Sequence, residues 1–295
     1  MSEAQTILIL GGGVGGLVTA VELRKKLPRQ HRIILVDRER NHLFAPSLLW
    51  LMTGLRTAEK ISRPLDLLRR KGIEVIHGEI EHIDPQRRQV TVAGKVLTTD
   101  YLVVSLGAEL NPEAIPGLAE AGHSFYTLAG AEGLRDALKK LRSGRIVILT
   151  ATPAYKCPAA PYEAAMLLEY DCRKRKIRNA VQVDLYAAEP GPMGVTGPEF
   201  SAGVRQMVEA KGIGFHPQQQ VTEVDPAARL IHFANGTAAP FDLLAYVPPH
   251  RAPQVVRQSG LVGDNGWVAV DRHTLETHSS KVYAIGDVTG IPLLL

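Results

Sequence analysis

The chain has 295 residues, of which 45% are hydrophobic and 22% are charged. That balance is typical of an ordinary globular protein, and the length predicts about two domains. The net charge of +4 is mildly basic, but no motif for nucleic-acid recognition accompanies the basic residues, so we expect no nucleic-acid partner. The densest basic run, at 173–178, is predicted to be the last turn of a solvated helix, with contact to an anionic membrane surface as the alternative.

The N-terminal residues lack the basic region of a secretory signal, and no stretch approaches the ~20 apolar residues of a membrane-spanning helix. The two cysteines, Cys157 and Cys172, do not make a disulfide framework. We therefore expect a protein that is cytoplasmic or peripheral on the cytoplasmic face of the membrane. We expect no metal site.

The first forty residues have the pattern of a βαβ unit. An apolar run at 7–10 leads directly into the glycine-rich segment at 11–16. Helical periodicity then covers 17–26, and 32–37 has the composition of a buried strand. Strand, glycine turn, helix and strand in this order predict part of a parallel sheet. Further along we predict a helix at 65–71, a strand at 74–77 and a hairpin at 89–98 around Ala93-Gly94.

The glycine spacing Gly11-x-Gly13-x-x-Gly16 is weak evidence alone, but here it follows a strand and opens a helix. The glycines permit a tight turn and let the backbone approach a pyrophosphate, which the helix N-terminus stabilises. Asp37 ends the next strand, 21 residues after Gly16. Its carboxylate can accept hydrogen bonds from ribose hydroxyls, which favours FAD or NAD over a 2′-phosphorylated nucleotide.

An internal repeat indicates a duplicated module. Ile83-Asp84-Pro85 recurs as Val224-Asp225-Pro226, at an offset of 141 that becomes 142 where Asp100 meets Asp242. The opening strand has its counterpart at 146–149. We therefore predict two copies of one βαβ-plus-hairpin module, with chance similarity of two α/β segments as the alternative.

The predicted fold class is α/β, with two tandem Rossmann-like dinucleotide-binding modules, the second inserted into the first. We expect a discontinuous FAD-binding domain at 1–112 and 245–295. The second, degenerate module, at 113–244, is expected to carry a redox cysteine.

The second copy lacks the glycine turn. After its first strand the chain reads from Thr150 to Pro158 without a glycine, and side chains and prolines there would obstruct a pyrophosphate. Glu189, after the later strand at 183–186, stands where a ribose-binding acid could sit, but without its partner turn. The sequence therefore disfavours direct use of NADH.

Cys157 lies in this altered turn, next to Lys156 and just before a helix predicted at about 161–174. A lysine and a helix N-terminus both lower the pKa of a thiol and favour the nucleophilic thiolate. The alternative is a buried structural cysteine.

Two segments resemble those of flavoproteins with two dinucleotide domains. Residues 99–108 resemble the strand that closes the FAD domain, although of the usual Ala-Thr-Gly only Gly107 is kept. Val282 to Asp287 resembles the late strand-Gly-Asp motif, whose aspartate binds the flavin ribityl chain in that class. The resemblance implies FAD as the cofactor, with a binding set of Gly11, Gly13, Val14, Gly15, Gly16, Asp37, Arg38, Ile80, Gly107, Gly286 and Asp287.

The chain as a whole resembles the sulfide-oxidising flavoproteins, namely sulfide:quinone oxidoreductase and the flavoprotein subunit of flavocytochrome c sulfide dehydrogenase. The selective segments are Cys157-Pro158-x-x-Pro161-Tyr162-Glu163 and Val247-Pro248-Pro249-His250-Arg251. In that family a pair of cysteines beside the flavin takes sulfur from sulfide as a persulfide and passes two electrons to FAD. The resemblance implies that Cys157 is one of this pair. Glu163 is expected to be a nearby base or a carboxylate that stabilises the helix dipole.

The resemblance also implies a small sulfur substrate and a quinone or cytochrome as electron acceptor. Cys172 cannot be the partner thiol, because 15 residues of helix would place it about 22 Å away, against the ~4.4–6.8 Å of a disulfide. The sequence stops at 291–295, where family members continue with a region that carries the second cysteine and the quinone or membrane contacts. We therefore expect a truncated chain. No cysteine precedes Cys157, so we expect no covalent flavin link.

Two other functions remain open at this point. One is a type II NADH dehydrogenase, which a glycine-rich turn near Thr150 would have supported. The other is a flavoprotein electron-transfer subunit that serves a cytochrome partner.

Overall fold

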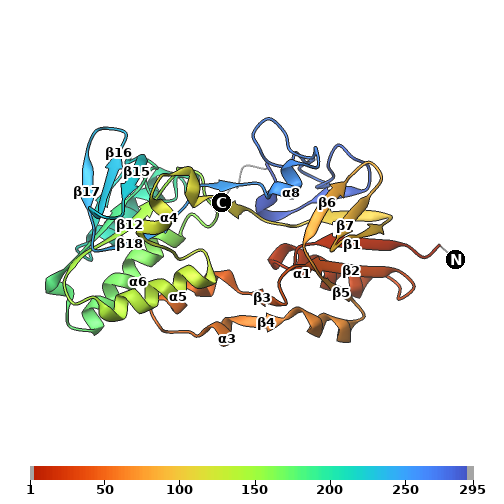
Figure 1. Cartoon of the computed structure of the whole chain (residues 1–295), viewed down its shortest axis with the longest axis horizontal. Helices are drawn as coiled ribbons and strands as arrows, with labels where there is room; N and C mark the ends of the chain where they lie inside the picture. The colour runs from red at the N-terminus through yellow and green to blue at the C-terminus, as the bar shows by residue number, and fades with distance from the viewer. Residues whose placement is uncertain (1–2, 291–295) are drawn as a thin grey trace. The chain divides into compact units, whose positions relative to one another are not determined.

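The computed structural model describes residues 3–290, and these divide into two compact units (Figure 1). The first unit contains 3–44, 62–109 and 251–290, and the second contains 45–61 and 110–250. Each unit is built on a five-stranded parallel sheet. The predicted α/β class, with one module inserted into another, is confirmed.

The sheet of the first unit has the order β20-β9-β1-β2-β5. Ile7 and Ile9 of its central strand pack with Ala20 of α1 on one face, whereas Leu8 and Leu10 face the opposite layer. This alternation follows from the two-residue period of a strand. The elements are β1 (Thr6–Leu10), α1 (Val14–Lys26), β2 (Arg32–Asp37), the 3-10 helix η2 (Leu65–Lys71), β5 (Glu74–His77), β9 (Tyr101–Val104), α8 (Gln254–Arg257) and β20 (Val282–Ala284).

The predicted βαβ unit is therefore confirmed, and η2, β2 and β5 have the predicted bounds. Helix α1 begins at Val14, three residues before the predicted start, because Gly13 is already its N-cap. The apolar periodicity could not reveal this first turn, since it consists of Val14 and glycines.

The second unit has the sheet order β11-β18-β12-β13-β14. Helix α6 packs against β12 and β13, and its last turn carries Arg173 and Lys174. Only these first two residues of the basic run at 173–178 lie in the last turn predicted for the whole run, because the helix ends at Lys174. Beyond it, Arg175 donates to the carbonyl groups of Leu138 and Leu141. The elements are α4 (Leu118–Ala121), β11 (His123–Ser124), α5 (Leu128–Lys140), β12 (Gly144–Thr150), α6 (Ala160–Lys174), β13 (Val181–Tyr186), α7 (Pro198–Glu209), β14 (Gly214–His216) and β18 (Leu243–Val247).

A three-stranded antiparallel sheet accompanies each parallel sheet, and the first two strands of the two copies match in length and pairing. Ile83 pairs with Val90 in the first copy, and Val224 pairs with Ile231 in the second. Both copies also shift register at the same place, between the first and third residues of their first strand. The strands are β6 (Ile80–Asp84), β7 (Gln89–Val92) and β8 (Lys95–Thr98), and β15 (Val221–Asp225), β16 (Leu230–Phe233) and β17 (Ala238–Pro240).

The repeat extends to the amino ends of the central strands. The Asp100 carboxylate accepts a hydrogen bond from the backbone N–H of Thr6 at 2.8 Å. The Asp242 carboxylate accepts one from the backbone N–H of Arg145 at 2.7 Å. Equivalent aspartates thus hold the starts of β1 and β12, which confirms a duplicated module rather than chance similarity.

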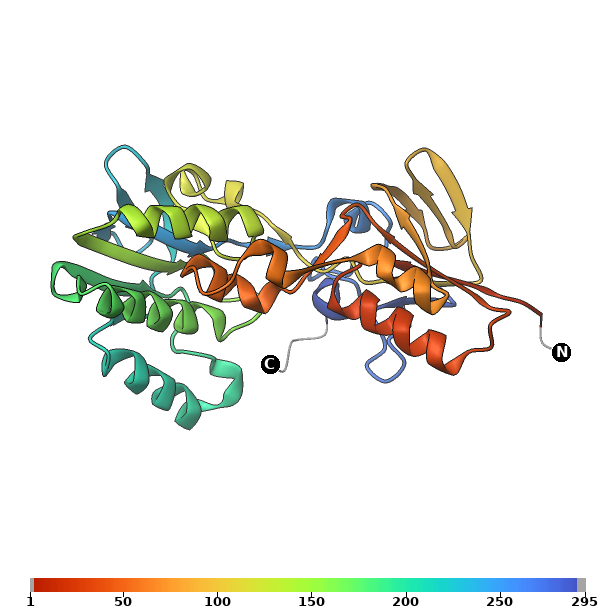
Figure 2. The ribbon, with the colours of Figure 1, turned by 90° about the horizontal axis from the view of Figure 1, so that it is seen from below.

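The segment 45–61 belongs to the second unit although it interrupts the first in sequence. Its helix α2 (Leu48–Met52) packs against α5 and α6 (Figure 2), and α3 (Ala58–Ile61) follows. The flanking strands β3 (Asn41–Leu43) and β4 (Ser62–Pro64) pair with each other in the first unit. The sequence analysis assigned no element to this segment.

The unit boundaries also differ from those expected from sequence. A boundary at 244/245 would cut β18, which is hydrogen-bonded to β12 along its length. The chain instead leaves the first unit after Glu109 and re-enters it at Arg251. Two hydrogen bonds, at 3.1 and 2.5 Å, join the Arg251 guanidinium to the Glu109 carboxylate, which also accepts from the backbone N–H of Gln254. Arg251 of the Pro-Pro-x-Arg segment therefore joins the point where the chain leaves the first unit to the point where it re-enters that unit.

The remaining elements are short. They are the strands β10 (Glu109–Leu110) and β19 (His250–Arg251) and the 3-10 turns η1 (Ala45–Ser47), η3 (Pro112–Ala114), η4 (Arg178–Ala180), η5 (Gly194–Thr196) and η6 (Gly286–Val288). Across residues 3–290, no helix has both the length and the apolar character needed to cross a bilayer. The chain end at 291–295, expected from sequence to be a truncation point, lies outside the described residues.

Replacing Asp100 or Asp242 by Ala should lower the melting temperature of the FAD-loaded protein by about 2–4 °C each. The reason is that each change removes the acceptor for a backbone N–H at the start of a central strand, that of Thr6 in β1 or of Arg145, the second residue of β12. Asp264→Ala, at an exposed loop position, is the matched control and should leave the melting temperature unchanged. Melting curves of Asp100→Ala and Asp242→Ala that coincide with the curve of Asp264→Ala would contradict this stabilising role of the two aspartates.

Candidate functional site

The predicted cofactor residues gather mainly at one edge of the first sheet. Strands β20, β9, β1 and β2 are parallel, so their carboxyl ends share that edge. The glycine turn at 11–13 follows β1, Asp37 ends β2, Gly107 follows β9, and Gly286 with Asp287 follows β20. In open parallel sheets this is the edge at which ligands bind.

Two glycines of the turn are required by close packing. Gly11 has a left-handed φ of +98°, and a Cβ there would overlap the carbonyl oxygen of Ser105. A Cβ on Gly16 would overlap the carbonyl oxygen of Gly11. These two positions therefore fix the turn and bring α1 close to β1.

Packing does not explain a glycine at position 13. It is the exposed N-cap of α1, no side chain caps the helix there, and no atom lies within 4 Å of where its Cβ would be. Val14, the first helical residue, is 56% exposed. The first N–H groups of a helix lack intrahelical partners and attract anions. This open, uncapped helix end fits the pyrophosphate of FAD.

Asp37 is held in place at the turn. One carboxylate oxygen accepts from the backbone N–H of Gly12 at 2.5 Å, and the other accepts from the backbone N–H of Glu39 at 2.7 Å. The side chain is half-buried beside the open helix end. Each carboxylate oxygen can accept a further bond, so the group retains capacity for ribose hydroxyls.

The other predicted cofactor residues differ in their exposure and in the contacts that they make. A Cβ on Gly107 or Gly286 would meet no atom within 4 Å, so space is open at both. Asp287 is half-buried in η6. Arg38 is exposed and forms ion pairs with Glu79 and Glu39, and Ile80 begins β6 and packs against the core. Arg38 directly follows the end of β2, whereas Ile80 belongs to the antiparallel sheet that accompanies the parallel one.

The corresponding turn of the second unit has a different construction. Three residues, 11–13, join β1 to α1, whereas nine residues, 151–159, join β12 to α6. Cys157 lies in this loop, exposed and with a left-handed φ of +55°. Its carbonyl oxygen accepts from the N–H of Ala160, the first residue of α6, which places Cys157 at that helix end. Glu163 is exposed on the first turn of α6.

A buried carboxylate lies under this loop. Glu189 is 8% exposed, and the hydroxyl groups of Tyr155, Tyr162 and Thr150 donate to it at 2.5, 2.7 and 2.7 Å. Burial and the negative charge of Glu189 raise the pKa of Tyr155 and of Tyr162 far above the ordinary value. Both tyrosines therefore stay protonated and act as donors.

Glu189 is the acid that the sequence placed where a ribose could bind. In the structure its oxygens are engaged by hydroxyl groups of its own unit. The sequence analysis missed Thr150, Tyr155 and Tyr162 as partners. The available signal for these partners was the presence of one tyrosine before Cys157 and one after it, and no short motif contains this pattern.

Cys172 is fully buried in α6. Burial raises the pKa of its thiol to about 11, with the nearby Asp171 carboxylate acting in the same direction. Cys172 is therefore a thiol packed in the core. This agrees with the expectation that Cys172 is not the partner of Cys157. Within 3–290 no group of three or more His, Cys, Asp or Glu side chains could hold a metal ion.

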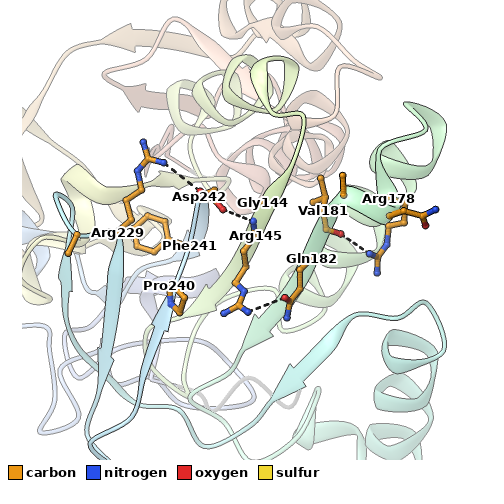
Figure 3. Close-up of a pocket in the computed structure, with 12 residues that line it drawn as sticks. Gly144, Arg145, Arg178, Val181, Gln182, Arg229, Pro240, Phe241 and Asp242 are labelled. Carbon is orange, nitrogen blue, oxygen red and sulfur yellow. Dashed lines mark hydrogen bonds and ion pairs between the residues drawn. The ribbon is translucent and has the colours of Figure 1, made fainter.

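A pocket of about 800 Å³ lies at the opposite edge of the second sheet (Figure 3). Its arginines already have partners: Arg145 bonds to Gln182, Arg178 to the carbonyl group of Val181, and Arg229 pairs with Asp242. The lining residues of β12 and β13 stand at the amino ends of these strands. Because dinucleotides bind at carboxyl ends, this pocket is not the counterpart of the glycine turn.

Comparison with known proteins agrees with this geometry. Residues 5–295 match the family model described as pyridine nucleotide-disulphide oxidoreductase. Over 98% of its length the chain is 30% identical to the sulfide-quinone reductase of Aquifex aeolicus (strain VF5), of which it covers 69%. Over 97% of its length it is 24% identical to the mitochondrial sulfide:quinone oxidoreductase of Mus musculus, of which it covers 66%.

A solved structure gives the same result. The X-ray structure of the sulfide:quinone oxidoreductase from the hyperthermophilic bacterium Aquifex aeolicus matches with a TM-score of 0.90 at 29% identity, covering 98% of this chain and 70% of that one. The chain thus spans about two thirds of the length of these relatives. With a family match over nearly its whole length and an open helix end that fits the cofactor, the chain belongs to the pyridine nucleotide-disulphide oxidoreductases and is an FAD-dependent oxidoreductase.

Proposed function

We propose that FAD binds at the carboxyl edge of the first sheet. Gly13 and the N-terminus of α1 would hold the pyrophosphate, Asp37 the adenosine ribose, and Asp287 the ribityl chain. The open space at Gly13 supports this assignment. The FAD-binding domain would then correspond to the first unit, near the expected ranges 1–112 and 245–295, and the redox cysteine would lie in the inserted module.

We infer that the enzyme oxidises sulfide or persulfide sulfur and passes the electrons to a quinone. The observation that carries this proposal is Cys157, an exposed thiol at a helix N-terminus in the loop that replaces a phosphate-binding turn. Relatives named as sulfide:quinone oxidoreductases, similar over nearly the whole chain, support the same substrate and acceptor.

In the proposed reaction the Cys157 thiolate is the group that takes up sulfur. Hydrosulfide joins the thiolate sulfur, an S–S bond forms, and one proton is released together with two electrons. Bound FAD would supply the two-electron acceptor, and the quinone would be the final acceptor of the two electrons. The dipole of α6 stabilises the thiolate. Glu163, exposed one turn into the same helix, is proposed as a base that accepts the proton.

A type II NADH dehydrogenase activity is disfavoured by one specific feature. The acid that would bind the NADH ribose, Glu189, is buried and already accepts three hydrogen bonds. A cytochrome remains a second candidate acceptor beside quinone. Because quinones reside in the bilayer, a quinone acceptor supports a peripheral position at a membrane surface, and we propose the cytoplasmic face, with the cytoplasm as the alternative location.

Gly13→Val should fold normally but lose FAD, because the Cβ of the new side chain meets no protein atom within 4 Å and the side chain occupies the space assigned to the pyrophosphate. We expect affinity for FAD to fall at least about tenfold, or about 1.4 kcal/mol. FAD content is read from absorbance after heat release, which also checks that the link is noncovalent. The control is Gly203→Val, at an equally open position of α7, which should retain FAD. Full FAD content in Gly13→Val would overturn the placement of the pyrophosphate.

NADH should reduce the flavin at least about a hundredfold more slowly than sulfide does, because a ribose would have to displace hydrogen bonds to a charged, buried acceptor. The measurement is anaerobic stopped-flow absorbance of the flavin with each reductant. Dithionite serves as the control that all of the flavin can be reduced. Rapid, saturable bleaching by micromolar NADH would refute this expectation.

Cys157→Ala should keep FAD and the fold but slow sulfide-dependent flavin reduction by at least about a hundredfold, since the nucleophile is removed. Cys157→Ser should behave alike, because a hydroxyl group is a far weaker nucleophile. Cys172→Ala is the matched control, and its rate should stay within about twofold of the parent because that thiol is buried. A Cys157→Ala protein as fast as the parent would mean that Cys157 takes no part.

A further inference from the structure

The conformation of the loop that carries Cys157 must be stabilised by contacts with residues outside the loop. It spans nine residues, 151–159, without a helix or strand. Cys157 has a φ of +55°, in the left-handed region that residues with a side chain populate sparsely. Such a conformation persists only where contacts from outside the loop determine it.

The first of these contacts comes from Tyr126. Its hydroxyl group donates to the carbonyl oxygens of Lys156 at 2.7 Å and of Cys157 at 3.2 Å. The half-buried ring lies edge-on against His250, with centroids 5.7 Å apart, and also contacts Phe125. Tyr126 is therefore fixed by groups outside the loop while it binds the backbone on both sides of the Cys157 nitrogen.

The second contact is Glu189. Thr150, just before the loop, Tyr155, within it, and Tyr162, just after it, all donate to this one carboxylate. Thr150 and Tyr162 are almost fully buried, which removes competing water. A single buried acceptor thus ties together the two ends of the loop and a residue two positions before Cys157.

We propose that Tyr126 and Tyr155 are positioning residues for Cys157. Through their hydrogen bonds they hold the loop so that the thiol stays at the N-terminus of α6, where the helix dipole favours the thiolate. The proposal rests on the chemistry proposed for Cys157 and deepens it, because it assigns the buried network a role in that chemistry. Neither tyrosine needs to touch the sulfur substrate.

The test measures alkylation of Cys157 by iodoacetamide across pH in the FAD-loaded protein, with peptide mass spectrometry to separate Cys157 from Cys172. The variants are Tyr126→Phe and Tyr155→Phe, each of which removes only a hydroxyl group. Tyr170→Phe is the matched control, on the exposed face of α6. Cys172 should stay unlabelled in all of them, which shows that the second unit remains folded.

We expect both variants to be alkylated about threefold more slowly than the parent at neutral pH, because loss of the helix-dipole interaction reduces the fraction of thiolate. At alkaline pH, where the thiol is fully ionised, the rates should be equal. Equal rates in all proteins at every pH would overturn the proposal. Slower alkylation by the same factor at every pH would also overturn it, since that indicates altered access rather than altered ionisation.

A second measurement separates this proposal from the proposed function. In Tyr126→Phe the limiting rate of flavin reduction by sulfide should fall, while the half-saturating sulfide concentration stays within about twofold. If the parent does not reduce its flavin with sulfide, the proposed function fails. The alkylation profile then still decides whether the tyrosines position Cys157.

Discussion

Parallel pairing of the strands is the constraint on which the rest of this molecule depends. Because β20, β9, β1 and β2 run in one direction, their carboxyl ends meet at one edge, and residues as distant in sequence as Gly11 and Asp287 come to the same side of the sheet. A glycine turn can then present an open helix end to an anion beside Asp37. The proposed cofactor site therefore depends on the parallel arrangement of these strands.

The second unit repeats this architecture, but the connection at the carboxyl end of its central strand is different. The strands, the accompanying three-stranded sheet and the aspartate at the start of the central strand all have counterparts in the first unit. The difference lies in the connection after that strand, which is longer and contains Cys157. Glu189 also belongs to this difference, because its carboxylate accepts hydrogen bonds from three hydroxyl groups of its own unit. In the second unit an acid near the end of a strand therefore supports the loop that contains Cys157.

The two cysteines illustrate how the environment separates similar groups. Cys157 and Cys172 lie just before and within the same helix, yet one is exposed at its N-terminus and the other is packed in the core. Burial raises the pKa of the Cys172 thiol to about 11, so that thiol is inert near neutral pH. The sequence spacing could exclude a disulfide between them, but the difference in solvent exposure is a property of the folded unit.

The sequence by itself determined the βαβ unit, the duplicated module and the residues of the glycine turn. These depend on local periodicity and fixed spacing, and β2, β5 and η2 have the predicted bounds. Only the tertiary structure decided that 45–61 packs in the second unit, that β18 belongs wholly to the second sheet, and that Tyr126 and Glu189 hold the Cys157 loop. The physical reason is that such contacts join residues about thirty or more positions apart in the sequence. Whether these residues meet depends on how whole elements pack, which leaves no periodic signal in the chain.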